Sequence, residues 1–563
     1  MTQNPGDDRT TVGAYLAARL VQLGADHLFG LPGDYNLSLL DEMLAAGEVR
    51  WTGSTNELNA AYAADGFARV GRRPAAMVTT YGVGELSALN GIAGSYAEDV
   101  PVVHVVGMPS RASMGRGAPL HHSFLDGDFR RFARMAAEVT AATAVLEPRT
   151  ATEEIDRVLR TAVDTSKPVY LGVPLDVATA RVSAAPLDTP LPQVDSEPEA
   201  LEEFRGALEL RLSREHEVCV LAGPRVHRRR CEALVAGLAE LPGVRVASQT
   251  GSKAVLDEGH PASLGTYMGA TTHSGAARDA VDHATLLVMA GTVESDFTTG
   301  FFTHRYDSAA AVELAVDHAR IGRAVYPGVR LEDALRVLGE LVTACDFAPV
   351  TPVDLVPPAR PEPGHGEEPL DQARFWAAVG EWLAPCTLVV AEAGTSFYGA
   401  LDLRLPRESD LLGSPVWSSI GFTLPATLGA GLARPEHRPV LFIGDGSAQL
   451  TIAELGTIYA RGLRPVIFLL NNAGYTVERA IQSPDAVYQD IVAWDWTAIP
   501  AALGAPDVAT FTVRTGNELA TALDAARDTS VATFVEVVLP PHDAPRLLVE
   551  LAKGVQATNT STE

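Results

Sequence analysis

The sequence is poor in cysteine and contains no long apolar run. Only 4 of its 563 residues are cysteines, and their spacing suits neither a disulfide framework nor a metal site. We therefore expect a reducing, cytoplasmic setting. No stretch of about 18 apolar residues occurs, and the polar N-terminus lacks the apolar centre of a signal peptide. The sequence predicts no membrane-spanning segment.

Basic charge is also scarce. The formal net charge is −26, and the one short basic run is His227–Arg230. This balance argues against nucleic acids and anionic membranes as partners. A phosphate-binding loop of the form GxxxxGK[ST] is missing as well, which disfavours an ordinary Mg²⁺-nucleotide enzyme.

Two stretches rich in proline and acidic residues interrupt the chain, at 183–200 and 349–370. They lack the periodic apolar positions of helices and strands and are typical of linkers. We expect three domains, which span residues 1–182, 200–345 and 370–550.

Short apolar runs alternate with amphipathic stretches in all three parts. The clearest amphipathic helix is expected at 12–24. Strands are expected at 49–54, 75–81, 100–107, 168–174, 218–223, 284–291, 387–394, 440–444 and 465–472. This alternation predicts an α/β fold with three doubly wound, mainly parallel sheets.

A carboxylate stands directly after one of these expected strands. Asp445 lies in the sequence GDG after the apolar run 439–443, and Asn472 follows the next strand, 27 positions later. That separation suits a strand–helix–strand unit, so both side chains are expected at one edge of a parallel sheet. A competing interpretation, in which Asp445 only caps a helix, does not account for Asn472.

Oxygen ligands of this kind favour a hard cation. The Asp445 carboxylate, the Asn472 amide oxygen and the backbone carbonyl of Gly474 together suit Mg²⁺ or Ca²⁺. Gly446 and Ser447 begin the following helix, whose first N–H groups can bind a phosphate. The pattern predicts a metal-bound diphosphate.

At this point the sequence resembles a known family. GDG followed by NN at this spacing resembles the diphosphate-binding signature of thiamine-diphosphate enzymes. The likeness is closest to the 2-keto acid decarboxylases that act on indolepyruvate, phenylpyruvate, branched-chain 2-keto acids or pyruvate. It extends over LPGDYNLSLLD (31–41), NELNAAYAADGFAR (56–69), YGVGELSALNGIAGSYAEDVPVVHVVG (81–107), LHHS (120–123), AEAGTSFYGA (391–400) and NNAGYTVERAI (471–481).

The resemblance implies a domain order and a set of catalytic residues. The three domains would be pyrimidine-binding, central and diphosphate-binding, in that order. Glu57 would bind the aminopyrimidine ring of thiamine diphosphate. Asp34, His121, His122 and Glu478 would form the polar catalytic set, whose individual roles the sequence does not divide.

The resemblance also implies a cofactor cradle. Ile420 would hold the cofactor in a bent shape, although a core isoleucine is an equal interpretation. Ser418 departs from the family, which commonly has glycine there; serine keeps the backbone carbonyl but restricts the backbone. The implied cofactor contacts are Glu57, Gly394, Thr395, Ser418, Ile420, Gly446, Ser447, Asn472 and Tyr475, and the implied metal ligands are Asp445, Asn472 and Gly474.

Apolar positions align with the substrate pockets of the branched-chain and aromatic enzymes, although each is equally explained as a core residue. An apolar pocket predicts an apolar substrate side chain larger than the methyl group of pyruvate. The aligned positions are Phe397, Val477, Ile481, Leu551 and Val555.

The expected reaction is non-oxidative decarboxylation of a 2-keto acid to an aldehyde and CO₂, with thiamine diphosphate and Mg²⁺. A carboligase that forms acyloins and a catalytically silent homologue are the alternatives. In this family the two ends of the cofactor are held by different subunits, which implies a homodimer as the minimal unit and commonly a homotetramer. The central part has no glycine-rich dinucleotide motif, so we expect no FAD.

Overall fold

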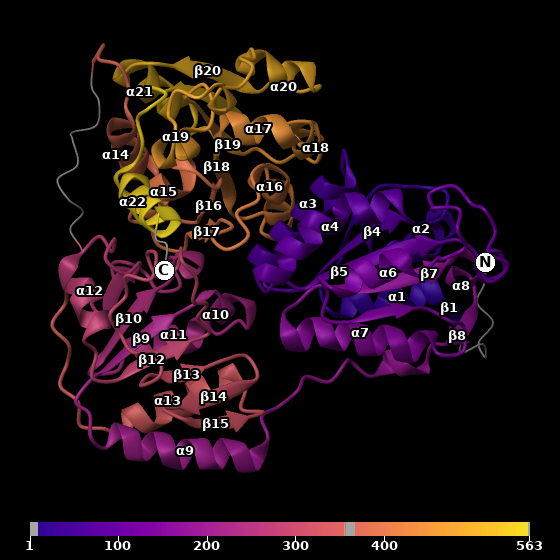
Figure 1. Cartoon of the computed structure of the whole chain (residues 1–563), viewed down its shortest axis with the longest axis horizontal. Helices are drawn as coiled ribbons and strands as arrows, with labels where there is room; N and C mark the ends of the chain where they lie inside the picture. Colours follow the sequence, from indigo (N-terminus) through magenta and orange to yellow (C-terminus); the bar gives the residue numbers. More distant parts are fainter. Residues whose placement is uncertain (1–8, 354, 356–365, 561–563) are drawn as a thin grey trace. The chain divides into compact units, whose positions relative to one another are not determined.

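The computed structural model describes residues 9–353, 355 and 366–560. The chain divides into two compact units, residues 1–194 with 428–433, and residues 195–427 with 434–563. One large sheet belongs to the first unit and two to the second (Figure 1). Every predicted strand, and the helix predicted at 12–24, overlaps an observed element. The predicted α/β class with three mainly parallel sheets is confirmed.

The first unit is built on a parallel sheet with helices on both faces. Thr11 caps the first helix, because its hydroxyl accepts a hydrogen bond from the Ala14 N–H at 3.2 Å. The sheet order is β3 (Arg50–Gly53), β2 (His27–Gly30), β4 (Ala75–Thr80), β5 (Val102–Met108), β7 (Val169–Pro174) and β6 (Thr143–Val145). A separate antiparallel pair joins β1 (Arg9–Thr11) to β8 (Arg181–Ser183). The helices are α1 (Val12–Gln22), α2 (Leu37–Leu44), α3 (Glu57–Gly71), α4 (Val83–Ala97), α5 (Arg111–Gly115), α6 (Arg131–Ala137), α7 (Ala151–Thr165) and α8 (Leu175–Ala178).

The second unit contains a mixed sheet, and its last strands depart from a purely parallel pattern. Its order is β11 (Ser263–Thr266), β10 (Val244–Ser248), β9 (Val218–Ala222), β12 (Leu287–Ala290), β13 (Val312–Leu314), β14 (His318–Ile321) and β15 (Ala324–Pro327). The pairs β13–β14 and β14–β15 are antiparallel. The helices are α9 (Pro198–Leu212), α10 (Pro224–Arg228), α11 (Glu232–Ala239), α12 (Gly275–Asp282) and α13 (Leu331–Thr343). β12 begins later than the predicted strand 284–291, because Ala284 still closes the last turn of α12.

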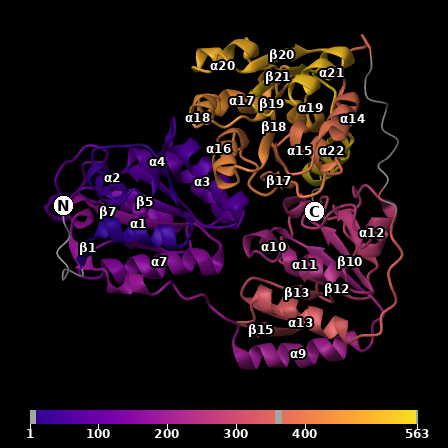
Figure 2. The same cartoon turned by 180° about the vertical axis from the view of Figure 1, so that it is seen from behind.

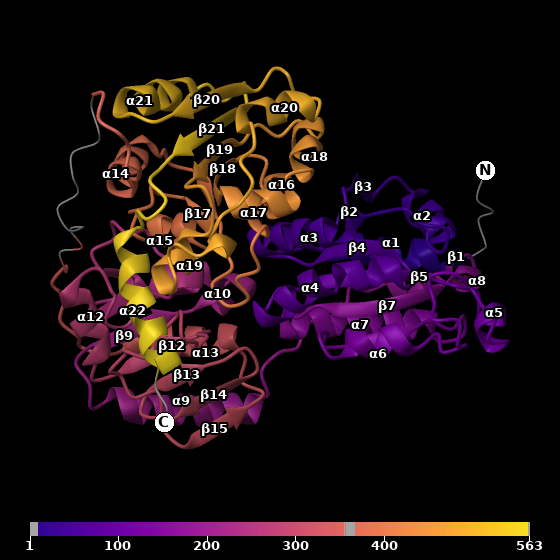
Figure 3. The ribbon, with the colours of Figure 1, turned by 45° about the horizontal axis from the view of Figure 1, so that its top comes forward.

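The other sheet of the second unit is wholly parallel, and Figure 2 shows it from behind. Its order is β17 (Asp410–Leu412), β16 (Thr387–Ala391), β18 (Arg438–Gly444), β19 (Val466–Asn471), β21 (Thr533–Val538) and β20 (Ala509–Val513). The helices are α14 (Gln372–Trp382), α15 (Thr395–Leu401), α16 (Thr423–Ala433), α17 (Asp445–Thr451), α18 (Glu454–Ala460), α19 (Thr476–Ile481), α20 (Ile499–Ala502), α21 (Gly516–Ala525) and α22 (Arg546–Thr560). α22 lies beside α19 (Figure 3). Because Gly444 pairs with Leu470, Asp445 and Asn472 leave the sheet at the same edge.

The two predicted linkers differ in how much of them the structure describes. The first holds the end of β8 and a short 3₁₀ turn before α9 begins at Pro198. Half of the second, residues 354 and 356–365, lies outside the described residues. Over the residues that the structure describes, no helix is long and apolar enough to cross a membrane.

Candidate active site

The loop after β2 carries Asp34 in a fixed shape. The side chain of Asn36 is fully buried, accepts a hydrogen bond from the Gly33 N–H at 2.8 Å and donates one to the Leu31 carbonyl at 3.0 Å. The backbone of β5 approaches this loop closely, since a Cβ atom at Gly107 would lie 2.3 Å from the Tyr35 carbonyl oxygen. Asp34 itself is exposed, so it is held by its neighbours and presented outward.

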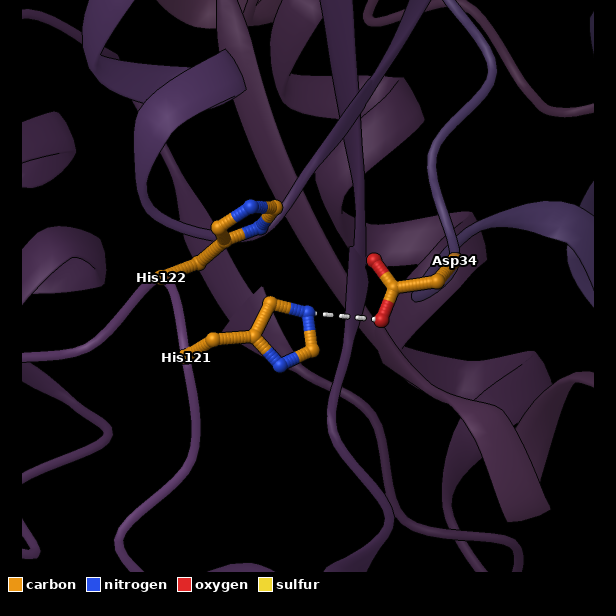
Figure 4. A group of neighbouring side chains, drawn as sticks. All are labelled: Asp34, His121 and His122. Carbon is orange, nitrogen blue, oxygen red and sulfur yellow. Dashed lines mark ion pairs between the residues drawn. The ribbon is translucent and has the colours of Figure 1, made fainter.

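The structure brings Asp34 together with both predicted histidines (Figure 4). His121 Nε2 lies 2.9 Å from Asp34 Oδ2, and one ligand atom of each of Asp34, His121 and His122 lies within 4.8 Å of the others. The Tyr35 ring stacks on His121 with centroids 5.0 Å apart. Within the described residues, the buried His122 Nδ1 has no hydrogen-bond partner. These side chains form one polar cluster that can exchange protons with a bound molecule.

Glu85 supports the loop that carries the histidines. Its buried carboxylate accepts hydrogen bonds from the Gly82 N–H at 2.8 Å and the Tyr170 hydroxyl at 2.9 Å. A Cβ atom at Gly82 would lie 2.0 Å from the His122 carbonyl oxygen, so only glycine allows this approach. Burial raises the pKa of Glu85 to about 7. The sequence analysis did not single out this residue.

Glu57 is the first residue of α3, where the Asn56 side chain caps the helix. Its side chain is half-buried and lies over α4, since a Cβ atom at Gly84 would be 3.1 Å from Glu57 Oε1. A small residue at position 84 therefore leaves room beside this carboxylate. The position fits the predicted contact with an aminopyrimidine ring, which stays a prediction.

Asp445 lies directly after β18, at the edge where β18 and β19 end. It is 1% exposed, and its carboxylate accepts hydrogen bonds from the N–H groups of Gly446 at 2.8 Å and Gly474 at 3.2 Å. Burial raises its pKa to about 6. Two hydrogen bonds do not offset the cost of burying a charged carboxylate, so a neighbouring cation would stabilise the ionised form of Asp445.

Asn472 supplies the second indication of a cation. Its side-chain oxygen is buried and accepts no hydrogen bond within the part of the chain that the structure describes. An orphaned buried oxygen costs about 1–3 kcal/mol, and a hard cation would satisfy it. Together with the Asp445 carboxylate and the Gly474 carbonyl it makes an all-oxygen donor set that fits Mg²⁺.

A cavity of about 250 Å³ opens beside these donors. It lies entirely within the second unit. Every residue predicted for this domain lines it except Leu551 and Val555; the lining ones are Gly394, Thr395, Phe397, Ser418, Ile420, Asp445, Gly446, Ser447, Asn472, Gly474, Tyr475, Val477, Glu478 and Ile481. The exposed Glu478 carboxylate therefore shares one cavity with the proposed metal donors.

One wall of the cavity is apolar. It includes Phe397, Val477 and Ile481, and also Phe297, which the sequence analysis missed because no motif marks the chain around it. The Phe297 ring stacks on Tyr398 with centroids 6.3 Å apart. By contrast, Leu551 is 2% exposed in the hydrophobic core, and Val555 is half-buried on α22.

Ser418 has the left-handed backbone that its family's glycine would favour. Its φ is 53°, a region that costs a serine more than a glycine. Hydrogen bonds compensate, since the Ser418 hydroxyl donates to the Ser414 carbonyl at 3.0 Å and the Ser414 hydroxyl accepts from the Ser418 N–H at 3.2 Å. Ile420 nearby is 38% exposed and lines the cavity rather than the core.

Glu392 is a second residue that the sequence analysis missed. It is buried at the end of β16, and it accepts hydrogen bonds from the Thr423 N–H at 3.1 Å and from the Ala393 N–H at 3.1 Å. Burial raises its pKa to about 7. The carboxylate ties the start of the cavity-lining loop at 393–395 to the N-terminal end of α16.

Three segments of the chain match the domains of one known enzyme family. Residues 10–127, 207–341 and 393–537 match the N-terminal TPP binding domain, the central domain and the C-terminal TPP binding domain of thiamine pyrophosphate enzymes. The chain belongs to the thiamine pyrophosphate enzyme family, as the sequence predicted. Each matched segment lies within one predicted domain, and the exact domain boundaries stay predictions.

Individual relatives within this family are alpha-keto-acid decarboxylases. The chain is 45% identical over 548 residues to the alpha-keto-acid decarboxylase of Mycolicibacterium paratuberculosis strain K-10, and the match covers 96% of both chains. The alpha-keto-acid decarboxylase of Mycobacterium tuberculosis strain H37Rv is 45% identical over 546 residues, again with 96% of both chains covered. The thiamine diphosphate-dependent 4-hydroxybenzoylformate decarboxylase of Rhodococcus jostii RHA1 shares the fold, with a TM-score of 0.76 at 21% identity, and the match covers 94% of this chain and 99% of that one.

Proposed function

We propose that this protein is a non-oxidative 2-keto acid decarboxylase that uses thiamine diphosphate and Mg²⁺ and releases an aldehyde and CO₂. The observation that carries the proposal is the single cavity that joins Asp445 and Asn472 to Glu478 and to an apolar wall. The relatives named alpha-keto-acid decarboxylase support the reaction class.

The residues present fit the cofactor. Asp445, Asn472 and the Gly474 carbonyl would hold Mg²⁺, and Gly394, Thr395, Gly446, Ser447 and Tyr475 would surround the diphosphate. Ser418 and Ile420 would contact the middle of the cofactor, and Glu57 its aminopyrimidine ring. When bound, the cofactor supplies a nucleophilic carbon for the substrate carbonyl and accepts the electron pair that CO₂ leaves behind.

The side chains around the substrate favour loss of CO₂. Glu478 places a negative charge in the cavity, which disfavours a second carboxylate there, so departure of the substrate carboxylate as neutral CO₂ relieves the repulsion. The apolar side chains in the cavity lining would reduce the access of water to the bound substrate; they are Phe297, Phe397, Val477 and Ile481. Their apolar surface favours a branched-chain or aromatic substrate over pyruvate, and Leu551 and Val555 stay predictions for the same pocket.

A proton must then reach the carbon that lost CO₂. The Asp34–His121–His122 cluster is suited to deliver it, because imidazole groups exchange protons readily near neutral pH. His121 already contacts a carboxylate that can hold or return the proton.

We propose that the working enzyme is a cytoplasmic homodimer or a homotetramer built from such dimers. Exposed apolar side chains between α19 and α20 support such an assembly, since Val487 is 86% exposed, Val492 74% and Tyr488 66%. A surface of this composition is typical of one that a partner covers. In such a dimer, Glu57 and Asp445 would act on one cofactor from different subunits.

The test is an aldehyde-release assay on the purified protein with thiamine diphosphate and Mg²⁺. A coupled alcohol dehydrogenase reports turnover of pyruvate, 2-ketoisovalerate, 2-ketoisocaproate, phenylpyruvate, indolepyruvate and benzoylformate. We expect one of the larger keto acids to have the highest kcat/KM and Glu478→Gln to lose at least about 100-fold in kcat/KM. Glu381→Gln, an exposed residue of α14, is the matched control and should retain activity.

Other outcomes decide between the alternatives. Acyloin in place of aldehyde would identify a carboligase. Cofactor binding without any product would identify a silent homologue. Pyruvate as the best substrate would contradict the role given to the apolar wall.

A further inference from the structure

Arg479 is a buried cation next to the catalytic candidate Glu478. It lies on α19, its side chain is 4% exposed, and its ion pair with Asp490 measures 2.8 Å. Buried arginines are uncommon unless they are fully paired. The hydrogen bonds of the Arg479 side chain show which segments it holds in place.

The guanidinium of Arg479 binds the loop between β19 and α19. Nη1 donates to the Asn472 carbonyl at 3.1 Å, and Nη2 donates to the Ala473 carbonyl at 2.8 Å. Both residues belong to the loop that also supplies two of the proposed metal donors, the Asn472 side-chain oxygen and the Gly474 carbonyl. Arg479 binds the backbone carbonyl of Asn472 and not its side-chain oxygen, which has no hydrogen-bond partner among the described residues.

The same guanidinium reaches a second segment. Nη2 also donates to the Gln489 carbonyl at 3.3 Å and to Asp490 Oδ1 at 2.8 Å. The Tyr475 N–H donates to the Gln489 carbonyl at 2.9 Å, which brings the two segments into backbone contact. Arg479 thus fastens the loop at 472–474 to residues 489 and 490.

The loop at 472–474 needs such support because its backbone conformation is unfavourable for a non-glycine residue. Ala473 has a φ of 58°, and Gly474 has a φ of 140°. A non-glycine residue in the left-handed region costs about 1–2 kcal/mol, so the free loop would favour other shapes. A Cβ atom at Gly474 would lie 2.0 Å from the Gln489 carbonyl oxygen, so the neighbouring segment leaves room only for glycine at this position.

We propose that Arg479 is a positioning residue that holds the 472–474 loop in the shape that binds the metal and, with it, the diphosphate. The five-donor fork of arginine is needed, because the carbonyls of Asn472, Ala473 and Gln489 and the carboxylate of Asp490 surround one guanidinium. The inference rests on the proposed use of Mg²⁺ and thiamine diphosphate. It adds that metal affinity is set partly by a residue that touches neither the metal nor the substrate.

The experiment measures metal affinity directly. The purified full-length protein is stripped of metal and cofactor, and thiamine diphosphate binding is followed by calorimetry as Mg²⁺ is varied. In Arg479→Gln we expect the half-saturating Mg²⁺ concentration to rise about 10- to 100-fold, as for other residues that orient metal ligands. Arg479→Lys should recover only part of the loss, since a single ammonium cannot span both segments.

Arg438 provides a matched control. It also donates to backbone carbonyls, with bonds of 2.9 Å to Arg464 and 2.8 Å to Val531, but it lies at the opposite end of β18. Arg438→Gln should lower thermal stability while the half-saturating Mg²⁺ concentration stays within about twofold. An equal shift in both variants would show that any lost arginine weakens binding, and the proposal would be wrong.

A second variant, Asp490→Asn, tests the same proposal if Arg479→Gln folds poorly. Asp490 is 70% exposed in its side chain, so Asp490→Asn removes the ion pair of Arg479 and leaves its hydrogen bonds to the backbone carbonyls in place. A rise of a few-fold in the half-saturating Mg²⁺ concentration is expected, and no rise would contradict the proposal. If the unmodified protein binds no thiamine diphosphate at any Mg²⁺ concentration, the proposed function itself fails, which is a distinct result.

Discussion

Replacing Glu85 by glutamine should change how the stability of the protein depends on pH. The Glu85 carboxylate is buried beneath the histidine loop, and burial raises its pKa to about 7 from an ordinary value of 4.5. Between these pH values the folded protein holds a proton that the unfolded chain releases. The contribution of Glu85 to stability is therefore fully present below pH 4.5 and is lost as the pH rises toward 7.

The size of the effect follows from the shift. A difference of about 2.5 pKa units corresponds to about 3 kcal/mol at 1.36 kcal/mol per unit. Glutamine keeps the geometry, because its oxygen can accept from the Gly82 N–H and its amide group can donate to the Tyr170 hydroxyl. It carries no titrating proton, so Glu85→Gln should gain about 2–3 kcal/mol over the unmodified protein between pH 5 and pH 8.

Urea denaturation of both proteins at pH 5, 6, 7 and 8 measures this gain, since the contributions of all other groups cancel in the comparison. Glu138→Gln, an exposed residue after α6, is the matched control and should show no gain that depends on pH. A constant difference between Glu85→Gln and the unmodified protein at all four pH values would refute the reasoning. It would mean that Glu85 is ionised in the folded protein throughout.

Three further predictions concern the cofactor site. Ser418→Gly should keep cofactor affinity, whereas Ser418→Val should destabilise the protein by about 1–3 kcal/mol, because a β-branched residue is strained at a φ of 53°; equal melting temperatures for the two variants would contradict this. Gly474→Ala should abolish the increase in melting temperature that thiamine diphosphate with Mg²⁺ produces, since the added Cβ would lie 2.0 Å from the Gln489 carbonyl oxygen; an unchanged increase would show that the loop adapts. A chelator should remove about 3 kcal/mol of stabilisation from protein saturated at about 100 times the Kd, and excess Mg²⁺ should restore it, as thermal denaturation would show.

Local patterns explain why the residues predicted to bind the diphosphate and its metal lie around one cavity. Asp445 and Asn472 each follow a continuous apolar strand, and parallel strands end at one edge of the sheet. The cavity-lining residues that the sequence predicted lie in a few short segments that have recognisable motifs. The structure adds that these segments surround a single cavity.

Other residues could not be predicted, because their roles depend on contacts between distant segments. Phe297 reaches the cavity from the loops after β12, where no motif or periodicity marks it. Arg479 lies inside a motif, but only the structure shows its contacts with Gln489 and Asp490. Glu85 likewise depends on Tyr170, which lies 85 positions away.

The sequence also could not show which of the predicted apolar residues line the cavity and which lie in the core. Ile481 and Leu551 are equally plausible pocket residues in the sequence, yet Ile481 lines the cavity and Leu551 is packed in the core. Periodicity indicates which face of a helix is apolar, and it does not say whether that face meets a core or a cavity. The antiparallel pairs β13–β14 and β14–β15 were missed for a related reason, because short strands of three or four residues carry little pattern.

The ratio of products tests the central claim most directly. Purified protein with thiamine diphosphate and Mg²⁺ is given 2-ketoisocaproate, and CO₂, aldehyde and acyloin are measured in the same reaction. The account predicts one aldehyde for each CO₂, little acyloin, and loss of both products in Glu478→Gln. CO₂ without a matching amount of aldehyde, or no CO₂ from any of the six keto acids although the cofactor binds, would contradict it.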